Sequence, residues 1–121
     1  MRLPSRLRLK ESRGFARIRE KGVSQGGKLL VLAILREEGV TDFQFGLVTG
    51  KKLGPAVVRN RLRRQLREVV RAHRAEICPG HLFVIIARWK AVNAKYSDLE
   101  ADWLRLARRL GLLLKPAPRS P

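Results

Sequence analysis

The feature that most constrains this chain is a basic stretch, residues 51–67, that also carries the signals of a helix start. It holds two lysines, five arginines and no acid. Gly54 and Pro55 stand before its helical part, and proline suits a first helical turn because its φ is preset and it has no N–H to leave unpaired. The stretch therefore predicts a cationic helix that runs to about Arg74.

The predicted helix has two different sides. At about 100° per residue, its apolar side chains fall in one narrow stripe that suits packing against a sheet. The stripe comprises Val58, Leu62, Leu66, Val69 and His73. The flank and far side carry Arg59, Asn60, Arg63, Arg64, Arg67, Arg71 and Arg74.

The charge on that far side favours a binding surface over an ordinary solvated face. Arginines four residues apart oppose an isolated helix by roughly a few tenths of a kcal/mol per pair. Glu68 is the one acid between Lys51 and Arg74. Because a helix that needed only solvation would carry more glutamates, the pattern favours contact with a polyanion.

Composition points to the same kind of partner. The chain of 121 residues suits one domain. Its 45% hydrophobic content excludes a basic chain that is disordered throughout. Its 27 lysines and arginines against 10 acids give a net charge of +17. A compact chain with that charge repels itself, so we expect an anionic partner, with nucleic acid first and an anionic membrane surface second.

The sequence also predicts a cytoplasmic location. Cys78 is the single cysteine, so no intramolecular disulfide can form, which is compatible with a reducing compartment. The longest apolar run, residues 29–35, is far short of the roughly 20 residues of a spanning helix. Residues 1–10 lack the apolar core of a secretory signal. We therefore expect no membrane contact.

The remaining pattern predicts an order of helix, strand, strand, helix, strand and helix. The two further helices are expected at residues 13–21 and 97–110, the strands at residues 28–36, 42–50 and 82–87, and a loop at residues 24–27. Residues 1–114 form the predicted domain, beginning with a basic extended arm over residues 1–10 and followed by a disordered proline-rich tail over residues 115–121.

These elements predict an α+β domain with one mixed sheet and helices packed on one side. The short connection between the first two strands predicts that they form a hairpin. If the second and third strands are parallel, the general rule predicts a right-handed crossover through the long helix. Ser97 and Glu100 form a capping-box pattern at the start of the last helix.

Phe15 has two interpretations. It shares one face of the first helix with Ile18, which favours core packing. Gly46 and Gly50 leave room for something to lie close to the backbone of the second strand. A base could stack on Phe15 there, as in the basic grooves with aromatic walls that bind single-stranded RNA. DNA stays open as a partner, although no helix-turn-helix pair is evident.

The residues carry no pattern of catalytic machinery. A magnesium-dependent nuclease needs clustered carboxylates, and the 10 acids are scattered. Asp98, Glu100 and Asp102 are better explained by capping and by the helix dipole. His73 and His81 have no recognisable partner for acid–base chemistry, and no zinc-ligand spacing is present. The sequence indicates a binding protein, with no catalytic residue and no metal site of its own.

The basic stretch and its surroundings resemble the signature of the bacterial ribonuclease P protein subunit. The matching residues are Phe45-Gly46-Leu47, Lys51-Lys52-Leu53-Gly54, Ala56-Val57, Arg59-Asn60-Arg61, Arg63-Arg64 and Arg67. The resemblance continues upstream through Arg6-Leu7 and Phe15, and downstream to Arg88, so that it covers nearly the whole chain except the tail.

The resemblance implies a fold and an activity. The fold is an α+β single domain with a mixed, mostly antiparallel sheet, helices packed on it and a left-handed βαβ crossover, like domain 2 of ribosomal protein S5; it replaces the right-handed expectation. The subunit binds the catalytic ribonuclease P RNA and the 5′ leader of precursor tRNA. It assists endonucleolytic removal of the leader. The RNA carries the chemistry, Mg²⁺ is held mainly by RNA and substrate, and the protein alone is inactive, with no small-molecule substrate.

The resemblance also implies site residues, carried over by position. The RNA-binding set is Lys51, Lys52, Arg59, Asn60, Arg61, Arg63, Arg64 and Arg67. The leader cleft comprises Phe15, Arg19, Gly46 and Arg88, which turns the interpretation of Phe15 from core packing to leader contact.

The chain departs from the family pattern at three positions. Arg19 stands where a second aromatic is often found, Ala33 stands at a frequently aromatic strand position, and Gly50 stands where a serine precedes the lysine pair. We therefore expect the cleft to hold the leader more by charge and less by stacking.

Two other classes of protein share the composition. A structural RNA-binding protein, such as a ribosomal component, is also basic and noncatalytic, but it would copurify with ribosomal RNA. A peripheral membrane or DNA-packaging protein would bind in a salt-sensitive way with no preference for RNA structure.

Overall fold

The apolar segments form a four-stranded mixed sheet in the order β1-β2-β4-β3 in the computed structural model, which describes residues 3–9 and 12–114. The strands are β1 (Val23–Gly26), β2 (Leu30–Arg36), β3 (Phe43–Val48) and β4 (His81–Ala87), and the α-helices are α1 (Ser12–Lys21), α2 (Ala56–Ala72) and α3 (Tyr96–Leu110). Short 3₁₀ turns are η1 (Ser5–Leu7), η2 (Lys51–Leu53), η3 (Arg74–Glu76) and η4 (Trp89–Asn93). The predicted tail, residues 115–121, lies outside the described residues.

Two local predictions about the sheet are wrong. Most of the predicted loop over residues 24–27 belongs to β1, which pairs antiparallel with β2. The predicted hairpin of β2 and β3 does not form, because β4 lies between them, antiparallel to β2 and parallel to β3. β4 is buried at five of its seven positions, Leu82 to Ile85 and Ala87, so it gains most from a central place, while β3 takes the edge.

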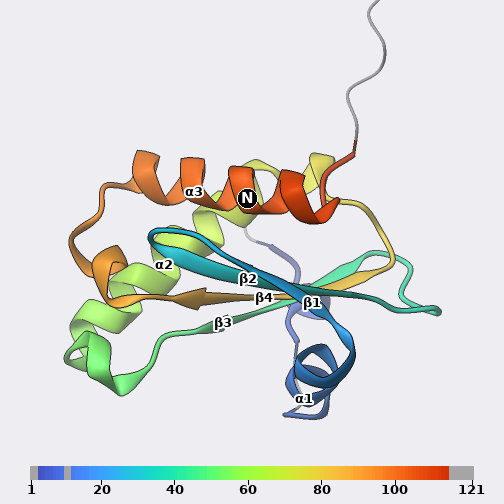
Figure 1. Ribbon diagram of the computed structural model, residues 1–121, viewed down its shortest axis with the longest axis horizontal. Helices are drawn as coiled ribbons and strands as arrows, with labels where there is room; N and C mark the ends of the chain where they lie inside the picture. The colour runs from blue at the N-terminus through green and yellow to red at the C-terminus, as the bar shows by residue number, and fades with distance from the viewer. Residues whose placement is uncertain (1–2, 10–11, 115–121) are drawn as a thin grey trace, which may run out of the picture.

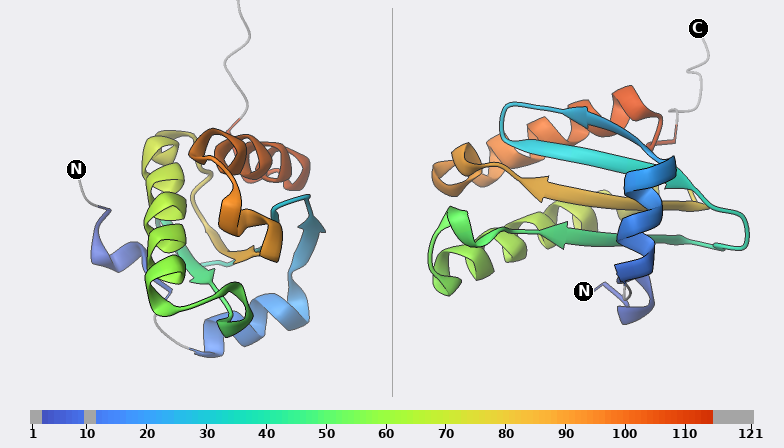
Figure 2. Two further views of the ribbon diagram at one scale, coloured as in Figure 1. Left: turned by 90° about the vertical axis from the view of Figure 1, so that its left-hand side faces the viewer. Right: turned by 60° about the horizontal axis from the view of Figure 1, so that its bottom comes forward.

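The crossover from β3 through α2 to β4 is left-handed. In the right-hand view of Figure 2, both strands run to the left, β4 lies above β3, and α2 passes behind them. The general right-handed rule therefore fails here, and the topology implied by the family resemblance is confirmed.

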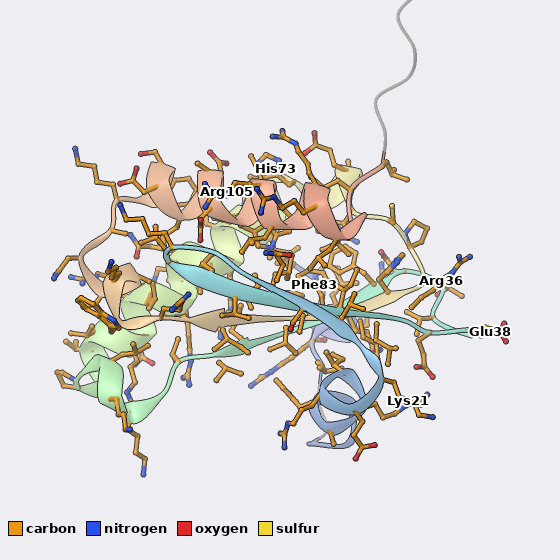
Figure 3. The ribbon with its side chains drawn as sticks, viewed as in Figure 1. Lys21, Arg36, Glu38, His73, Phe83 and Arg105 are labelled. Atoms are coloured by element: carbon orange, nitrogen blue, oxygen red, sulfur yellow. The ribbon has the colours of Figure 1, made fainter. Side chains whose placement is uncertain are left out.

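Helices cover both faces of the sheet, which corrects the expectation that they pack on one side. α2 and α3 lie over the face that carries Leu32, Phe83 and Ile85 (Figures 1 and 3). The ring centroids of Phe83 and of Trp103 in α3 are 6.4 Å apart. α1 packs on the opposite face, where Ile18 joins a small cluster with Leu82 and Val84. That second face is covered by one short helix, so part of it stays open.

α3 begins differently from the prediction. It starts at Tyr96 after Lys95, with no side-chain cap, so the predicted capping box of Ser97 and Glu100 does not form. Asp102 is not a dipole-compensating surface residue either, since it is only 4% exposed. Its carboxylate accepts the backbone N–H groups of Leu29 and Leu30 at 3.1 and 3.0 Å.

The carboxylate of Asp102 ties α3 to the beginning of β2. A side chain at Gly27 would occupy the same place, because a Cβ there would lie 2.6 Å from Asp102 Oδ2. Arg105, one turn further along α3 and labelled in Figure 3, donates a hydrogen bond to the same carboxylate. Asp102 is therefore a buried hydrogen-bond anchor.

We expect Asp102→Ala to lower the free energy of unfolding by about 2–4 kcal/mol, because it leaves one buried and one part-buried N–H group without an acceptor. Urea unfolding followed by circular dichroism measures the change. Asp98→Ala, which removes an exposed acid from the same helix, is the matched control and should change the stability by less than about 0.5 kcal/mol. Equal losses in the two variants would contradict the anchoring role.

His73 links the end of α2 to α3. It is the C-terminal cap of α2, and its Nδ1 and Nε2 atoms lie 2.5 and 2.9 Å from carboxylate oxygens of Glu76 and Glu100 (Figure 3). Its ring also lies 5.9 Å from that of Trp103. Partial burial opposes ionisation, but the hydrogen bonds to the two glutamates outweigh it and raise the pKa of His73 above 6.5.

A raised folded-state pKa means that the folded protein binds this proton more tightly than the unfolded chain does. The stabilisation is thus complete below the unfolded pKa of 6.5 and is lost as pH rises through the folded value. We expect the free energy of unfolding to fall as pH rises above 6.5 and through the raised folded-state pKa, and His73→Gln to flatten that fall. His81→Gln is the control; a fall that persists in His73→Gln and disappears in His81→Gln would refute the assignment.

Candidate RNA-binding groove

The N-terminal arm forms one wall of a groove at the free edge of β3. The Leu9 N–H donates a hydrogen bond of 2.8 Å to the Phe45 carbonyl, and Arg8 pairs with Phe45 as a parallel bridge. Leu7, in η1, is 1% exposed and belongs to the main core. The described part of the predicted extended arm is therefore a packed segment with a 3₁₀ turn, and it lies beside α2 in the left-hand view of Figure 2.

The groove has a volume of about 790 Å³ and brings together four separate segments of the chain. Its walls are the arm, α1, β3 and α2. The lining residues are Leu3, Pro4, Ser5, Arg8, Leu9, Phe15, Phe45, Gly46, Leu47, Arg63 and Arg67.

Phe15 lies in the groove, directly against the backbone of β3. Its ring is half-buried and packs on the cluster around Ile18. A Cβ at Gly46 would lie 2.5 Å from Phe15 Cζ, so the ring reaches this position only because residue 46 is glycine. The same ring therefore packs on the core cluster and lines the groove, and its contact with a leader stays a prediction.

The predicted RNA-binding set divides into three groups on the structure. Arg63 and Arg67 line the groove from α2. Arg59 and Arg61 donate hydrogen bonds to the protein's own backbone, at the Gly54 carbonyl (3.2 Å) and the Val92 carbonyl (3.1 Å) respectively. The exposed remainder is Lys51, Lys52, Asn60 and Arg64.

Two residues of the predicted leader cleft lie outside the groove lining. Arg19 is exposed on α1. Arg88 follows β4 and donates a hydrogen bond of 2.8 Å to the Gly27 carbonyl. By strand alternation Arg88 stands on the same open face of the sheet as Gly46. It lies further toward the end at which the parallel strands β3 and β4 terminate.

Sequence reasoning missed Arg8 and the apolar residues of the arm. The signal was available, because Leu7 and Leu9 bracket Arg8 in an alternating pattern typical of a strand-like segment with one buried side. Their burial places Arg8 at the groove, where it adds a third cation to Arg63 and Arg67.

The two α2 cations of the groove have no carboxylate partner among residues 3–9 and 12–114. Ion pairs form elsewhere, for example between Asp42 and both Arg6 (3.1 Å) and Arg74 (3.8 Å). Within the described part of the chain, no three metal-ligating side chains gather into a cluster, and no helix is long and apolar enough to cross a membrane. The groove therefore offers unpaired positive charge beside an aromatic ring.

Comparison with known proteins identifies the family. The family model described as Ribonuclease P matches residues 3–111. The chain belongs to the ribonuclease P protein family. Among its relatives, the ribonuclease P protein component of Syntrophomonas wolfei is 31% identical over 115 residues, which cover 95% of this chain and 96% of the relative. That of Exiguobacterium sibiricum is 38% identical over 98 residues, covering 81% and 84%.

Solved structures of the family share the fold. The RNase P protein of Staphylococcus aureus superposes with a TM-score of 0.82 at 26% identity, covering 88% of this chain and 96% of that chain. The RNase P protein of Thermotoga maritima gives a TM-score of 0.74 at 27% identity, covering 90% and 96%. The chain is thus the protein component of ribonuclease P, a ribonucleoprotein endoribonuclease of tRNA processing, and it associates with ribonuclease P RNA.

The contact between Gly46 and Phe15 gives a prediction. We expect Gly46→Ala to lower the free energy of unfolding by about 1–3 kcal/mol, because the new methyl group overlaps the ring. Gly50→Ala is the matched control, since nothing lies within 4 Å of a Cβ there. In a Phe15→Leu background the cost of Gly46→Ala should shrink. An undiminished cost in that background, measured by thermal unfolding, would show that the strain lies elsewhere.

Proposed function

We propose that this protein binds the catalytic RNA of ribonuclease P and the 5′ leader of precursor tRNA, and so assists Mg²⁺-dependent removal of the leader. The observation that carries the proposal is the groove itself, in which Arg63 and Arg67 of α2 face the same space as Phe15 and Gly46. A cationic wall opposite an aromatic ring suits a single strand, whose phosphates and bases need different partners.

In this proposal α2 serves the catalytic RNA and the groove serves the leader. The RNA-binding set is Lys51, Lys52, Arg59, Asn60, Arg61, Arg63, Arg64 and Arg67. Because Arg63 and Arg67 belong to α2 and also line the groove, the two RNAs meet there. Arg59 and Arg61, held to backbone carbonyls, present their remaining N–H groups in fixed positions.

The leader cleft comprises Phe15 and Gly46 in the groove, with Arg19 and Arg88 beside it on the open side of the sheet. With Arg19 in place of a second aromatic, the leader is held chiefly through its phosphates. The sequence of the leader then matters less than its charge, because phosphate contacts carry no base information.

We assign the chemistry to the RNA subunit. In this assignment the RNA and the substrate hold most of the Mg²⁺, and the protein alone, a cytoplasmic component, cleaves nothing. The protein contributes binding energy and positioning, which are sufficient to lower the Mg²⁺ concentration that the RNA requires. Family membership favours this function over a ribosomal component or a membrane or DNA-packaging protein.

The experiment that tests the proposal is reconstitution with ribonuclease P RNA at low Mg²⁺. Added protein should restore leader cleavage. It should also make the enzyme bind precursor tRNA more tightly than mature tRNA. Cleavage that does not improve with protein would overturn the proposal.

The double variant Arg63→Ala/Arg67→Ala should weaken binding to the catalytic RNA and flatten its salt dependence. The slope of log K against log salt should lose the equivalent of about two phosphate contacts. Arg108→Ala/Arg109→Ala removes the same charge from an exposed part of α3 and is the matched control. Filter binding across salt concentrations measures both; equal slopes for the two variants would place the contacts outside α2.

A further inference from the structure

The two tryptophans of the chain occupy opposite environments. Trp103 lies on the buried side of α3 and is 0% exposed, whereas Trp89 is 72% exposed at the start of η4. Trp89 is not among the residues that line the groove. Tryptophan is enriched at contact surfaces, since it combines a broad apolar face with one polar N–H.

The ring lies on a corner built by three elements. η4 packs against α2 and η2, and the Arg61 guanidinium donates a hydrogen bond to the Val92 carbonyl of η4. Lys90 Nζ lies 5.5 Å from the centroid of the Trp89 ring. Lys51 and Lys52 of η2 are exposed on the same corner. Trp89 is thus an aromatic face on a cationic surface.

The corner is also free of acid in sequence. Residues 43–67, which include η2 and most of α2, contain no aspartate or glutamate, and neither do residues 77–97, which include η4. An apolar protein partner that covered Trp89 would have to desolvate the surrounding lysines without compensation. An unpaired nucleotide offers a π-face to the ring and phosphates to the lysines, so it satisfies both features at once.

We propose that Trp89 stacks on an unpaired nucleotide of the catalytic RNA, with Lys90 and the η2 lysines on the neighbouring phosphates. The inference rests on the proposed function. The catalytic RNA is chosen over the leader because η4 is joined to the first half of α2, the helix assigned to that RNA, through the bond from Arg61 to Val92. The leader groove lies against the arm and the later turns of α2 instead.

The test compares Trp89→Ala and Trp89→Phe in binding to full-length ribonuclease P RNA. Trp89→Ala should weaken binding at least about fivefold, because it removes a stacking surface, whereas Trp89→Phe should stay within about threefold. The loss should be the same at low and high salt, since the indole carries no charge. Val23→Ala, which trims another exposed apolar side chain (58%) on β1, at the opposite edge of the sheet from β3, is the matched control and should not change binding.

Fluorescence gives a second readout from the same protein. RNA should quench the exposed Trp89, and in Trp89→Phe the remaining signal of buried Trp103 should hardly change. A third readout is the preference for precursor over mature tRNA in the reconstituted enzyme, which Trp89→Ala should leave unchanged.

Three results would overturn the inference. The first is wild-type affinity of Trp89→Ala for the catalytic RNA, while Arg63→Ala/Arg67→Ala still weakens binding; this leaves the proposed function standing. The second is a change confined to the preference for precursor tRNA, which would place Trp89 on the leader. The third is a wild-type protein that does not distinguish ribonuclease P RNA from an unrelated RNA of equal length, which would overturn the proposed function as well.

Discussion

The arrangement of this protein depends on the burial of one side of α2 against the sheet. Leu62 and Leu66 are 2% and 0% exposed, and each buried side chain of this size contributes about 1.5–3 kcal/mol. Because a helix has 3.6 residues per turn, fixing those two positions also fixes its rotation about its own axis. Arg63 and Arg67, each one residue further along, are thereby turned toward the edge of the sheet. The hydrophobic contact therefore aims the cations, and the like charges on the helix are tolerated because the core offsets their repulsion.

Because β3 is the edge strand, the groove beside it lies in front of those cations. An edge strand exposes unpaired backbone groups, and here the arm satisfies part of that edge through the bond from Leu9 to Phe45. The strand carries Gly46, whose missing side chain admits the Phe15 ring from α1 on one face, while α2 arrives on the other. Had β3 been inserted between β2 and β4, both of its edges would have been paired, and the arm could not have bonded to it. The strand order leaves β3 at the edge of the sheet, and this place allows the arm to complete the groove.

The sequence predicted the parts of this structure that follow from local pattern. The stripe of α2, the strand around Phe83 and the position of α3 needed only periodicity and helix signals. The strand order was not predictable from residues alone, because a short connection between β2 and β3 says nothing about a later strand that inserts between them. Asp102 was assigned to the helix dipole for a similar reason: its partners, Leu29 and Leu30, lie more than seventy residues away in the sequence. The left-handed crossover came from the family resemblance, against the general rule, and Arg8 was missed because the arm was expected to extend freely.

The acids show how a chain with a net charge of +17 keeps one side clear for RNA. Surface ion pairs add little to stability, so where the few carboxylates lie matters more than how many pairs they form. Asp42 pairs with Arg6 and Arg74, and Glu76 and Glu100 hold His73, all outside the two acid-free segments that meet at η2 and η4. The carboxylates thus reduce the repulsion between cations at the contacts between elements. Over the first turns of α2 no carboxylate of the described residues does so. Binding a polyanion relieves the remainder, so the free energy that the fold forgoes on that side is recovered on association with RNA.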